Sequence, residues 1–197
     1  MAFWTDSTLQ DPKRAYRFLV NLGNMPGGAR WYAKSAKKPE ISISTVEHNF
    51  LNHKFYYPGR AEWAEVTVTL VDPLDPDAAA NTAAIIQASG YHPPANAQDT
   101  TTISKQDAVK AMGTVTIAQI DSKGQIVEKW TLWNCFIIGV TYGDLDYSSD
   151  DMTEITLTLR YDWASLETTG QGSETGARDP NGRQVDGNNF FLTGDKK

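Results

Sequence analysis

The 197-residue chain has a single cysteine, Cys135, which excludes an internal disulfide framework. Cys135 lies in the apolar run WNCFIIGV, so we expect a small buried hydrophobic residue rather than a reactive thiol. No stretch is apolar for long enough to span a bilayer. The first residues lack the basic flank and apolar core of a secretory signal. We therefore expect a cytosolic protein with no membrane partner.

Basic residues are scarce as well. The chain has 18 Lys and Arg against 24 Asp and Glu, a net charge of -6. Tight binding of a phosphate backbone needs clustered cations, so this balance argues against a nucleic-acid-binding protein while allowing passing contact with DNA. One small basic patch contains Arg30, Lys34, Lys37 and Lys38. It is interpreted either as a solvated loop or as a complement to an acidic surface on a neighbouring subunit.

Catalytic and cofactor motifs are missing too. The three histidines have no metal-ligand spacing with the cysteine, and no HExxH, Walker loop, dinucleotide fingerprint or GxSxG elbow occurs. The acidic run DLDYSSDDMTE, residues 144–154, lacks the spacing of an EF-hand. We interpret it as a solvated loop, with a calcium site as the alternative. The expectation is a protein without enzyme activity, cofactor or metal.

Alternation of apolar and polar residues predicts β-strands along most of the chain. Expected strands cover residues 15–22, 30–35, 40–46, 66–71, 113–121, 124–142 and 152–163. In the fourth of these strands, Val66, Val68 and Leu70 share one face. The run 130–142 is apolar on both faces, so we predict one strand buried between layers or in an interface.

One helix is predicted over residues 75–90, with Asp75 as N-cap, Pro76 in the first turn and Gly90 as C-terminal cap. Residues 91–108 are predicted to form a long surface loop. The organisation is then one domain over residues 14–166. It is flanked by an N-terminal extension, 1–13, and a polar C-terminal extension, 167–197.

The run NFLNHKFYYPGRAEWAEVTVTLV, residues 49–71, is rich in aromatic residues and predicts a hairpin. Tyr57 to Arg60 have the residue order of a type II turn. Aromatic residues and arginine anchor protein interfaces. The hypothesis is that the hairpin contacts a neighbouring copy or the next ring of copies. The proposed interface residues are Phe50, Phe55, Tyr56, Tyr57, Arg60 and Trp63, with an ordinary core position as the alternative for Trp63.

The order of elements, the run PGRAEWAEVTVTLVD and the closing strand ITLTLRYDW resemble the tail tube proteins of contractile-tailed, myovirus-type bacteriophages. The resemblance covers residues 14–166. It implies a mainly β fold, an antiparallel β-sandwich or barrel with one packed α-helix. It further implies a structural virion protein that self-assembles into stacked hexameric rings, the inner tail tube through which viral DNA is ejected.

The same resemblance implies the partners: the tail sheath protein, the tape-measure protein, the baseplate and tail terminator proteins, and double-stranded DNA in transient, non-specific passage. The location is the virion tail tube, and the host cytoplasm during assembly. A polar and acidic lumen would repel DNA rather than hold it. The residues expected to face the lumen are Glu65, Thr67, Glu154, Thr156 and Thr158.

Two other functions stay open. One is a tube or ring protein of the same fold, such as an Hcp-like tube of a contractile injection or secretion system, a tail terminator or a baseplate ring. The other is a carbohydrate-binding β-sandwich that uses aromatic side chains to stack on sugars. The candidate platform residues are Trp31, Tyr32, Tyr91 and Trp133.

Overall fold

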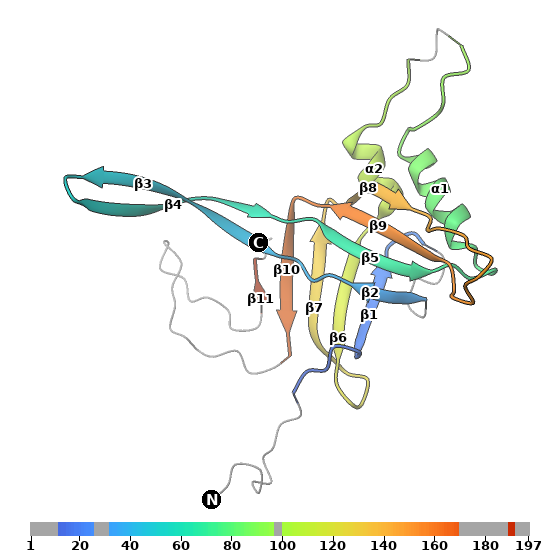
Figure 1. Cartoon of the computed structure of the whole chain (residues 1–197), viewed down its shortest axis with the longest axis horizontal. Helices are drawn as coiled ribbons and strands as arrows, with labels where there is room; N and C mark the ends of the chain where they lie inside the picture. The colour runs from blue at the N-terminus through green and yellow to red at the C-terminus, as the bar shows by residue number, and fades with distance from the viewer. Residues whose placement is uncertain (1–11, 26–31, 97–99, 170–188, 192–197) are drawn as a thin grey trace, which may run out of the picture.

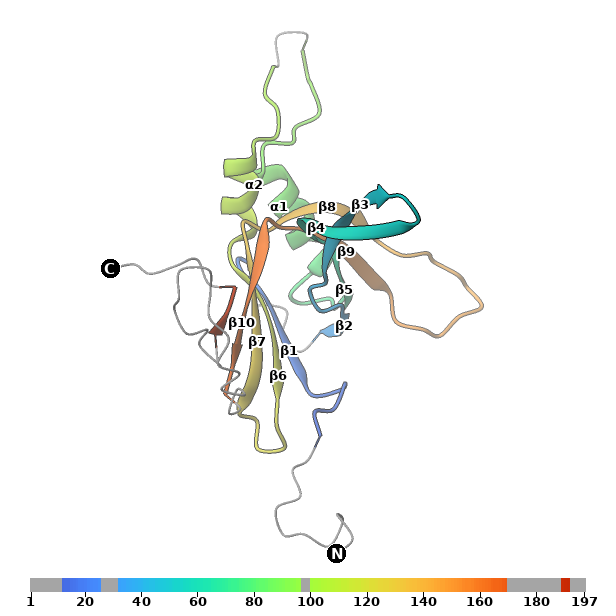
Figure 2. The ribbon, with the colours of Figure 1, turned by 90° about the vertical axis from the view of Figure 1, so that its left-hand side faces the viewer.

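The computed structural model describes residues 12–25, 32–96, 100–169 and 189–191, without the side chains of 189 and 190. Most of the two predicted extensions lies outside these residues. The described chain is mainly β, as expected, and its two larger sheets pack face to face with helices at one end (Figures 1 and 2). A third, two-stranded sheet projects from the sandwich as a long arm (Figure 1).

Every strand pair in the two larger sheets is antiparallel. The five-stranded sheet has the order β1-β6-β7-β10-β11, with bounds Phe18–Leu22, Val115–Ile120, Ile126–Trp133, Trp163–Thr168 and Asn189–Phe190. The four-stranded sheet has the order β2-β5-β9-β8, with bounds Ala33–Ala36, Val66–Val71, Glu154–Arg160 and Phe136–Thr141.

The core lies between the two sheets and follows the predicted alternation. In the four-stranded sheet, six apolar side chains of β5 and β9 are fully buried: Val66, Val68, Leu70, Ile155, Leu157 and Leu159. They meet apolar residues of the five-stranded sheet, among them Val20, Val115 and Leu132. Removing such side chains from water is the main stabilising term of the fold. Cys135 is 1% exposed and belongs to this core, as expected.

The predicted single strand over residues 130–142 is wrong, because the chain changes sheets in its middle. β7 ends at Trp133 in the five-stranded sheet, and β8 begins at Phe136 in the four-stranded sheet. Asn134 makes the break with φ 54°, a left-handed conformation that asparagine tolerates. A strand that changes sheets also changes its buried face, which explains why the run looked apolar on both sides.

The predicted closing strand, residues 152–163, divides in the same way. β9 ends at Arg160 in one sheet and β10 begins at Trp163 in the other. The two breaks lie side by side, since the Asp162 N–H donates to the Trp133 carbonyl at 3.0 Å. The sandwich is therefore closed at this end by two neighbouring crossovers.

The helical region differs from the prediction at both ends. Helix α1 spans Ala78–Ala88, and its N-cap is Asp77 rather than Asp75. The Asp77 carboxylate accepts from the Ala80 N–H. The carboxylate of Asp72 accepts from the two preceding N–H groups, those of Ala78 and Ala79, at 3.2 and 3.3 Å. Two carboxylates therefore satisfy the first helical turn, whose donors have no partners within the helix.

A second helix was missed. Helix α2 spans Lys105–Met112, and its first half lies in the predicted surface loop, residues 91–108. Ser104 caps it by accepting from the Asp107 N–H at 3.1 Å, and Gly113, with φ 73°, ends it. A Ser-x-x-Asp cap was therefore present in the sequence. The polar composition hid it, because only Ala108 and Met112 of this helix are buried.

The arm is formed by β3, Ile41–Phe50, and β4, His53–Trp63. Its turn is at Leu51 and Asn52, so the turn predicted at Tyr57 to Arg60 is wrong. Leu51 has φ 50° and takes the left-handed position of the tight connection. The residues of the predicted turn lie inside β4, several residues from the tip.

Candidate assembly surfaces

The arm exposes almost its whole surface. Each residue of β3 and β4 is exposed except Trp63 at its root. Apolar side chains on it include Ile43 and Val46, each 60% exposed, Phe50 at 61% and Tyr56 at 63%. An isolated two-stranded ribbon is marginally stable in water. Exposed apolar groups gathered on one projection are typical of a surface that binds another protein.

A β-bulge shapes the middle of the arm. Thr45 pairs with Pro58 and Ile43 with Ala61, so two residues of β4, Gly59 and Arg60, lie opposite Ser44 alone. The Ser44 hydroxyl accepts from the Arg60 N–H at 2.9 Å. A Cβ on Gly59 would lie 2.4 Å from the Ser44 oxygen. The Pro-Gly pair therefore marks a bulge, which twists the ribbon, and not a chain reversal.

Trp63 anchors the arm to the sandwich. Its ring lies 6.1 Å from that of Tyr161 and 5.5 Å, edge to face, from that of Phe191. Burial raises the pKa of Tyr161 to about 12. Of the six residues proposed for the interface, five are exposed on the arm and Trp63 packs against the core at its base. Their assignment to an interface stays a prediction.

The five residues predicted to face a lumen lie together on the outer face of the four-stranded sheet. Thr67 pairs with Thr158 across β5 and β9, and Glu154 and Thr156 follow on the same side of β9. The Glu65 carboxylate lies 3.5 Å from the Arg160 guanidinium. This face is therefore polar, uncharged at its centre and flanked by ion pairs.

The four-stranded sheet has β2 and β8 as its outer strands. Within the described part of the chain, neither strand has a second neighbour in this sheet. Each therefore has one side whose main-chain N–H and C=O groups pair with no strand. Residues of α1 and α2 lie beside β8 around Phe136, Ile137 and Ile138. Ile138 of β8 is 46% exposed at this edge.

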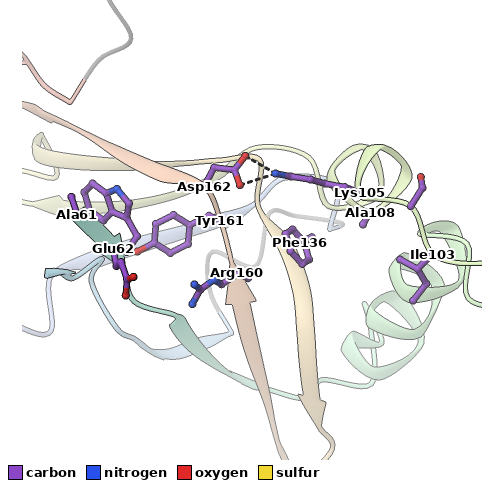
Figure 3. Close-up of a pocket in the computed structure, with 11 residues that line it drawn as sticks. Ala61, Glu62, Ile103, Lys105, Ala108, Phe136, Arg160, Tyr161 and Asp162 are labelled. Carbon is purple, nitrogen blue, oxygen red and sulfur yellow. Dashed lines mark hydrogen bonds and ion pairs between the residues drawn. The ribbon is translucent and has the colours of Figure 1, made fainter. Parts of the chain in front are cut away.

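A cluster at the crossover corner holds α2 against the sheets (Figure 3). The Lys105 ammonium donates to both carboxylate oxygens of Asp162 at 2.7 Å, and Asn134 Nδ2 donates to one of them at 2.7 Å. The hydrogen bond from Lys105 holds the pKa of Asp162 below its usual range. The neighbouring cleft of about 660 Å³ includes Glu62 and Arg160 on its wall. These three hydrogen bonds connect Asp162 to α2 and to the sheet crossover at Asn134, which indicates a structural role.

The predicted basic patch is paired within the chain. Lys34 bonds to Glu154, Lys37 lies 3.0 Å from Glu40, and Lys38 bonds to Glu128. Arg30 lies outside the described residues. The three described lysines are about half exposed and paired with carboxylates of the same chain, which agrees with a solvated surface. Their contact with a neighbouring subunit stays a prediction.

Glu128 is the most buried carboxylate of these pairs, at 8% exposed. Burial alone would raise its pKa, but hydrogen bonds from Lys13, Lys38 and the Trp130 indole N–H outweigh burial and lower it to about 2. The indole nitrogen lies 2.8 Å from a carboxylate oxygen. This carboxylate links the chain before β1 and the β2–β3 connection to the inner face of the five-stranded sheet.

The acidic run forms an exposed loop between β8 and β9. Asp146 accepts from the N–H and the hydroxyl of Ser148, and these bonds lower its pKa. The described residues include no group of three or more side chains placed to hold a metal ion. Among the described residues, neither helix is long and apolar enough to cross a membrane.

The aromatic residues considered for sugar stacking do not form one platform. Tyr32 is 1% exposed and lies in the core, so its assignment to a sugar site is wrong. Trp133 stacks on Trp163 with ring centroids 6.1 Å apart and donates to Ser165. Tyr91 follows α1 in the sequence, and Trp31 lies outside the described residues.

No protein-family model matches the chain, and no curated protein matches its sequence. Solved structures do match its fold. A chain of the sheath–tube complex of the PVC extracellular contractile injection system, in its extended state, aligns with TM-score 0.59 at 19% identity. The alignment covers 80% of this chain and 93% of that one.

Two further structures agree. A chain of the PVC sheath/tube terminator aligns with TM-score 0.60 at 18% identity, covering 81% of this chain and 99% of that one. A chain of the anti-feeding prophage baseplate aligns with TM-score 0.58 at 16% identity, covering 80% and 97%. The chain therefore has the fold of the tube proteins of contractile injection systems.

Proposed function

We propose that the chain is a tube subunit of a contractile tail or injection machine, which assembles into hexameric rings that stack into a hollow tube. The observation that carries the proposal is the arm, because its exposed apolar surface needs a partner and an identical copy supplies one in every assembly. The fold shared with contractile injection tubes supports it.

Ring formation follows from the free edges of the four-stranded sheet. β8 of one copy pairs with β2 of the next, which satisfies the main-chain groups of both strands. Such a contact joins two different surfaces, so it continues around a circle until the ring closes. Six copies of this sheet then make a barrel of about 24 strands.

The size of that barrel fits a conduit. With strands about 4.8 Å apart and tilted by about 40°, its circumference is about 150 Å and its backbone diameter roughly 48 Å. Barrels of 16–18 strands already leave an aqueous channel. The outer face of the four-stranded sheet becomes the lining, with Thr67, Thr156 and Thr158 in its middle and Glu65 and Glu154 at its margins.

The lining also suits the passage of cargo. Threonine hydroxyls offer no fixed charge, and Glu65 and Glu154 are neutralised by Arg160 and Lys34. A wall without free cations releases no counterions from DNA and adds no affinity for it. In the bacteriophage version of this function the cargo is viral DNA, the tape-measure protein occupies the tube beforehand, and the tube resides in the virion after assembly in the host cytoplasm.

The second candidate is the tube of an injection or secretion system, whose cargo is protein. It is favoured by the structural neighbours, which come from a sheath–tube complex, a terminator and a baseplate of injection systems. In both versions the partners are a sheath, a baseplate and a terminator. Purified particles distinguish the two: nuclease-protected DNA in a head indicates a phage, and headless particles indicate an injection system.

Negative-stain microscopy of the purified protein, with analytical ultracentrifugation, tests tube formation. We expect rings or hollow tubes from the wild type and their loss in Arg60→Ala and in the double variant Tyr56→Ala, Tyr57→Ala. Tyr91→Ala, an exposed aromatic outside the arm, is the matched control and should assemble normally. A strictly monomeric wild type, even when seeded with a baseplate, would refute the proposal.

A further inference from the structure

The loop between β8 and β9, residues 142–153, projects apolar side chains into solvent. Leu145 is 87% exposed, Tyr147 is fully exposed and Met152 is 71% exposed. Together with the acidic residues around them they line an open hollow of about 740 Å³. We call this segment the acidic loop.

The acidic loop and the arm lie at opposite ends of the four-stranded sheet. The arm leads into β5 at Val66, and the acidic loop leads into β9 at Glu154. The register pairs Val66 with Leu159 and Val71 with Glu154, so the two projections are separated by the full length of β5. Figure 1 shows the arm extending to the left and the loop at the right-hand end of the sheet.

The two projections differ in charge. Residues 142–153 contain four aspartates, Asp144, Asp146, Asp150 and Asp151, and no lysine or arginine. On the arm, residues 41–63, Lys54 and Arg60 are balanced by Glu47 and Glu62. Lys54 pairs with Glu47 at 2.9 Å, so Arg60 is the cation that the arm offers to the aspartates. Both also carry exposed apolar side chains. Interfaces with a buried apolar centre and opposite charges at the rim combine affinity with orientation.

We propose that the arm of one copy docks on the acidic loop of a second copy in the adjacent ring, with aromatic side chains of the arm against Leu145, Tyr147 and Met152. The inference rests on the proposed tube function and names the receptor for the arm. In this arrangement the outer strands β2 and β8 form the contacts within a ring. The arm and the acidic loop, at opposite ends of the sheet, form the contacts between rings. Because the contact joins opposite ends of the molecule, each copy repeats it and the filament grows without limit.

The chain is well suited to a cross-linking test. Its single cysteine, Cys135, is buried, and burial raises the pKa of its thiol to about 12, so it does not compete for a maleimide. Asn52→Cys at the arm tip and Ser148→Cys in the acidic loop are placed in two separately tagged copies. The copies are mixed, allowed to assemble, and treated with a short bismaleimide. His92→Cys, in the exposed segment after α1, replaces the loop variant in the control.

We expect a cross-linked heterodimer of the Asn52→Cys and Ser148→Cys copies, at least tenfold more abundant than with His92→Cys. Tubes visible by microscopy without this heterodimer would overturn the inference and leave the proposed function standing. Absence of rings and tubes from the wild type would refute the proposed function itself.

A second variant separates stacking from ring formation. Leu145→Ser combined with Tyr147→Ser removes two exposed side chains of the loop and touches no core residue. We expect single rings in the ultracentrifuge and no tubes by microscopy, because the edges β2 and β8 are intact. Tubes of normal length from this variant would contradict docking on the acidic loop.

Discussion

Protonation of Glu128 should weaken the fold between pH 4.5 and pH 2. Its pKa is lowered from 4.5 to about 2, because the hydrogen bonds from Lys13, Lys38 and Trp130 outweigh the cost of burial. A carboxylate with a depressed pKa in the folded state stabilises the fold above the pKa of the unfolded chain. That stabilisation is complete above pH 4.5 and is lost as the pH falls toward 2.

The size of the effect follows from the same values. Each unit of pKa is worth about 1.4 kcal/mol, so a fall from 4.5 to about 2 corresponds to about 3 kcal/mol at neutral pH. The side chains of Lys13 and Lys38 are about half exposed, and solvent screening reduces the figure toward about 2 kcal/mol. More than half of it should be gone by pH 3.

The assay compares wild type with Glu128→Gln by urea unfolding of the unassembled subunit at pH 7, 5 and 3. Glutamine keeps an oxygen for the Trp130 N–H and removes the charge. The difference in unfolding free energy should be about 2 to 3 kcal/mol at pH 7 and shrink by more than half at pH 3. Glu40→Gln, at the exposed pair with Lys37, is the control and should cost under about 1 kcal/mol. A difference that is equal at pH 7 and pH 3 would refute the reasoning.

Three other changes give distinct outcomes. Gly59→Ala should distort the bulge opposite Ser44, leaving the thermal midpoint of the subunit unchanged while tube yield in micrographs falls; normal tubes would contradict this. Asp162→Ala removes the bonds from Lys105 and should lower the urea unfolding free energy by about 1–2 kcal/mol. Thr158→Lys should leave tubes intact but make DNA co-sediment with them at low salt and not at high salt.

The buried faces of the strands could be predicted from sequence, because side chains alternate strictly along a strand. Val66, Val68 and Leu70 were expected on one face, and each is 0% exposed. The outward position of Thr67 follows from the same rule. The rule does not say what an outward face contacts, because threonine is compatible with solvent, with a lumen and with a neighbouring subunit.

The hairpin turn was misplaced for a local reason. Pro58 and Gly59 satisfy the residue preferences of a turn and of a bulge equally well. The choice between turn and bulge depends on Ser44, fourteen residues before Pro58. The Ser44 hydroxyl accepts from the Arg60 N–H and fills the space that a Cβ on Gly59 would need. The true turn at Leu51 and Asn52 has no glycine or proline, so no strong local signal pointed to it.

The strand that changes sheets shows why an apolar run can be assigned to the wrong layer. Trp130 and Leu132 pack inward from the five-stranded sheet, and after Asn134 the chain packs Ile137 and Val140 inward from the other. Only the left-handed φ of Asn134 and its bond to Asp162 separate the two halves.

That corner also connects fold to assembly. Because β7 and β9 both leave their sheets there, β8 becomes an outer strand of the four-stranded sheet instead of an extension of β7. The free edge proposed to close the ring therefore exists only if Asn134 and Asp162 make the crossover. Lys105, from the helix that sequence reasoning missed, holds Asp162 in place. We expect a subunit that lost this corner to retain most of its core and to lose the edge that we propose pairs with the next copy.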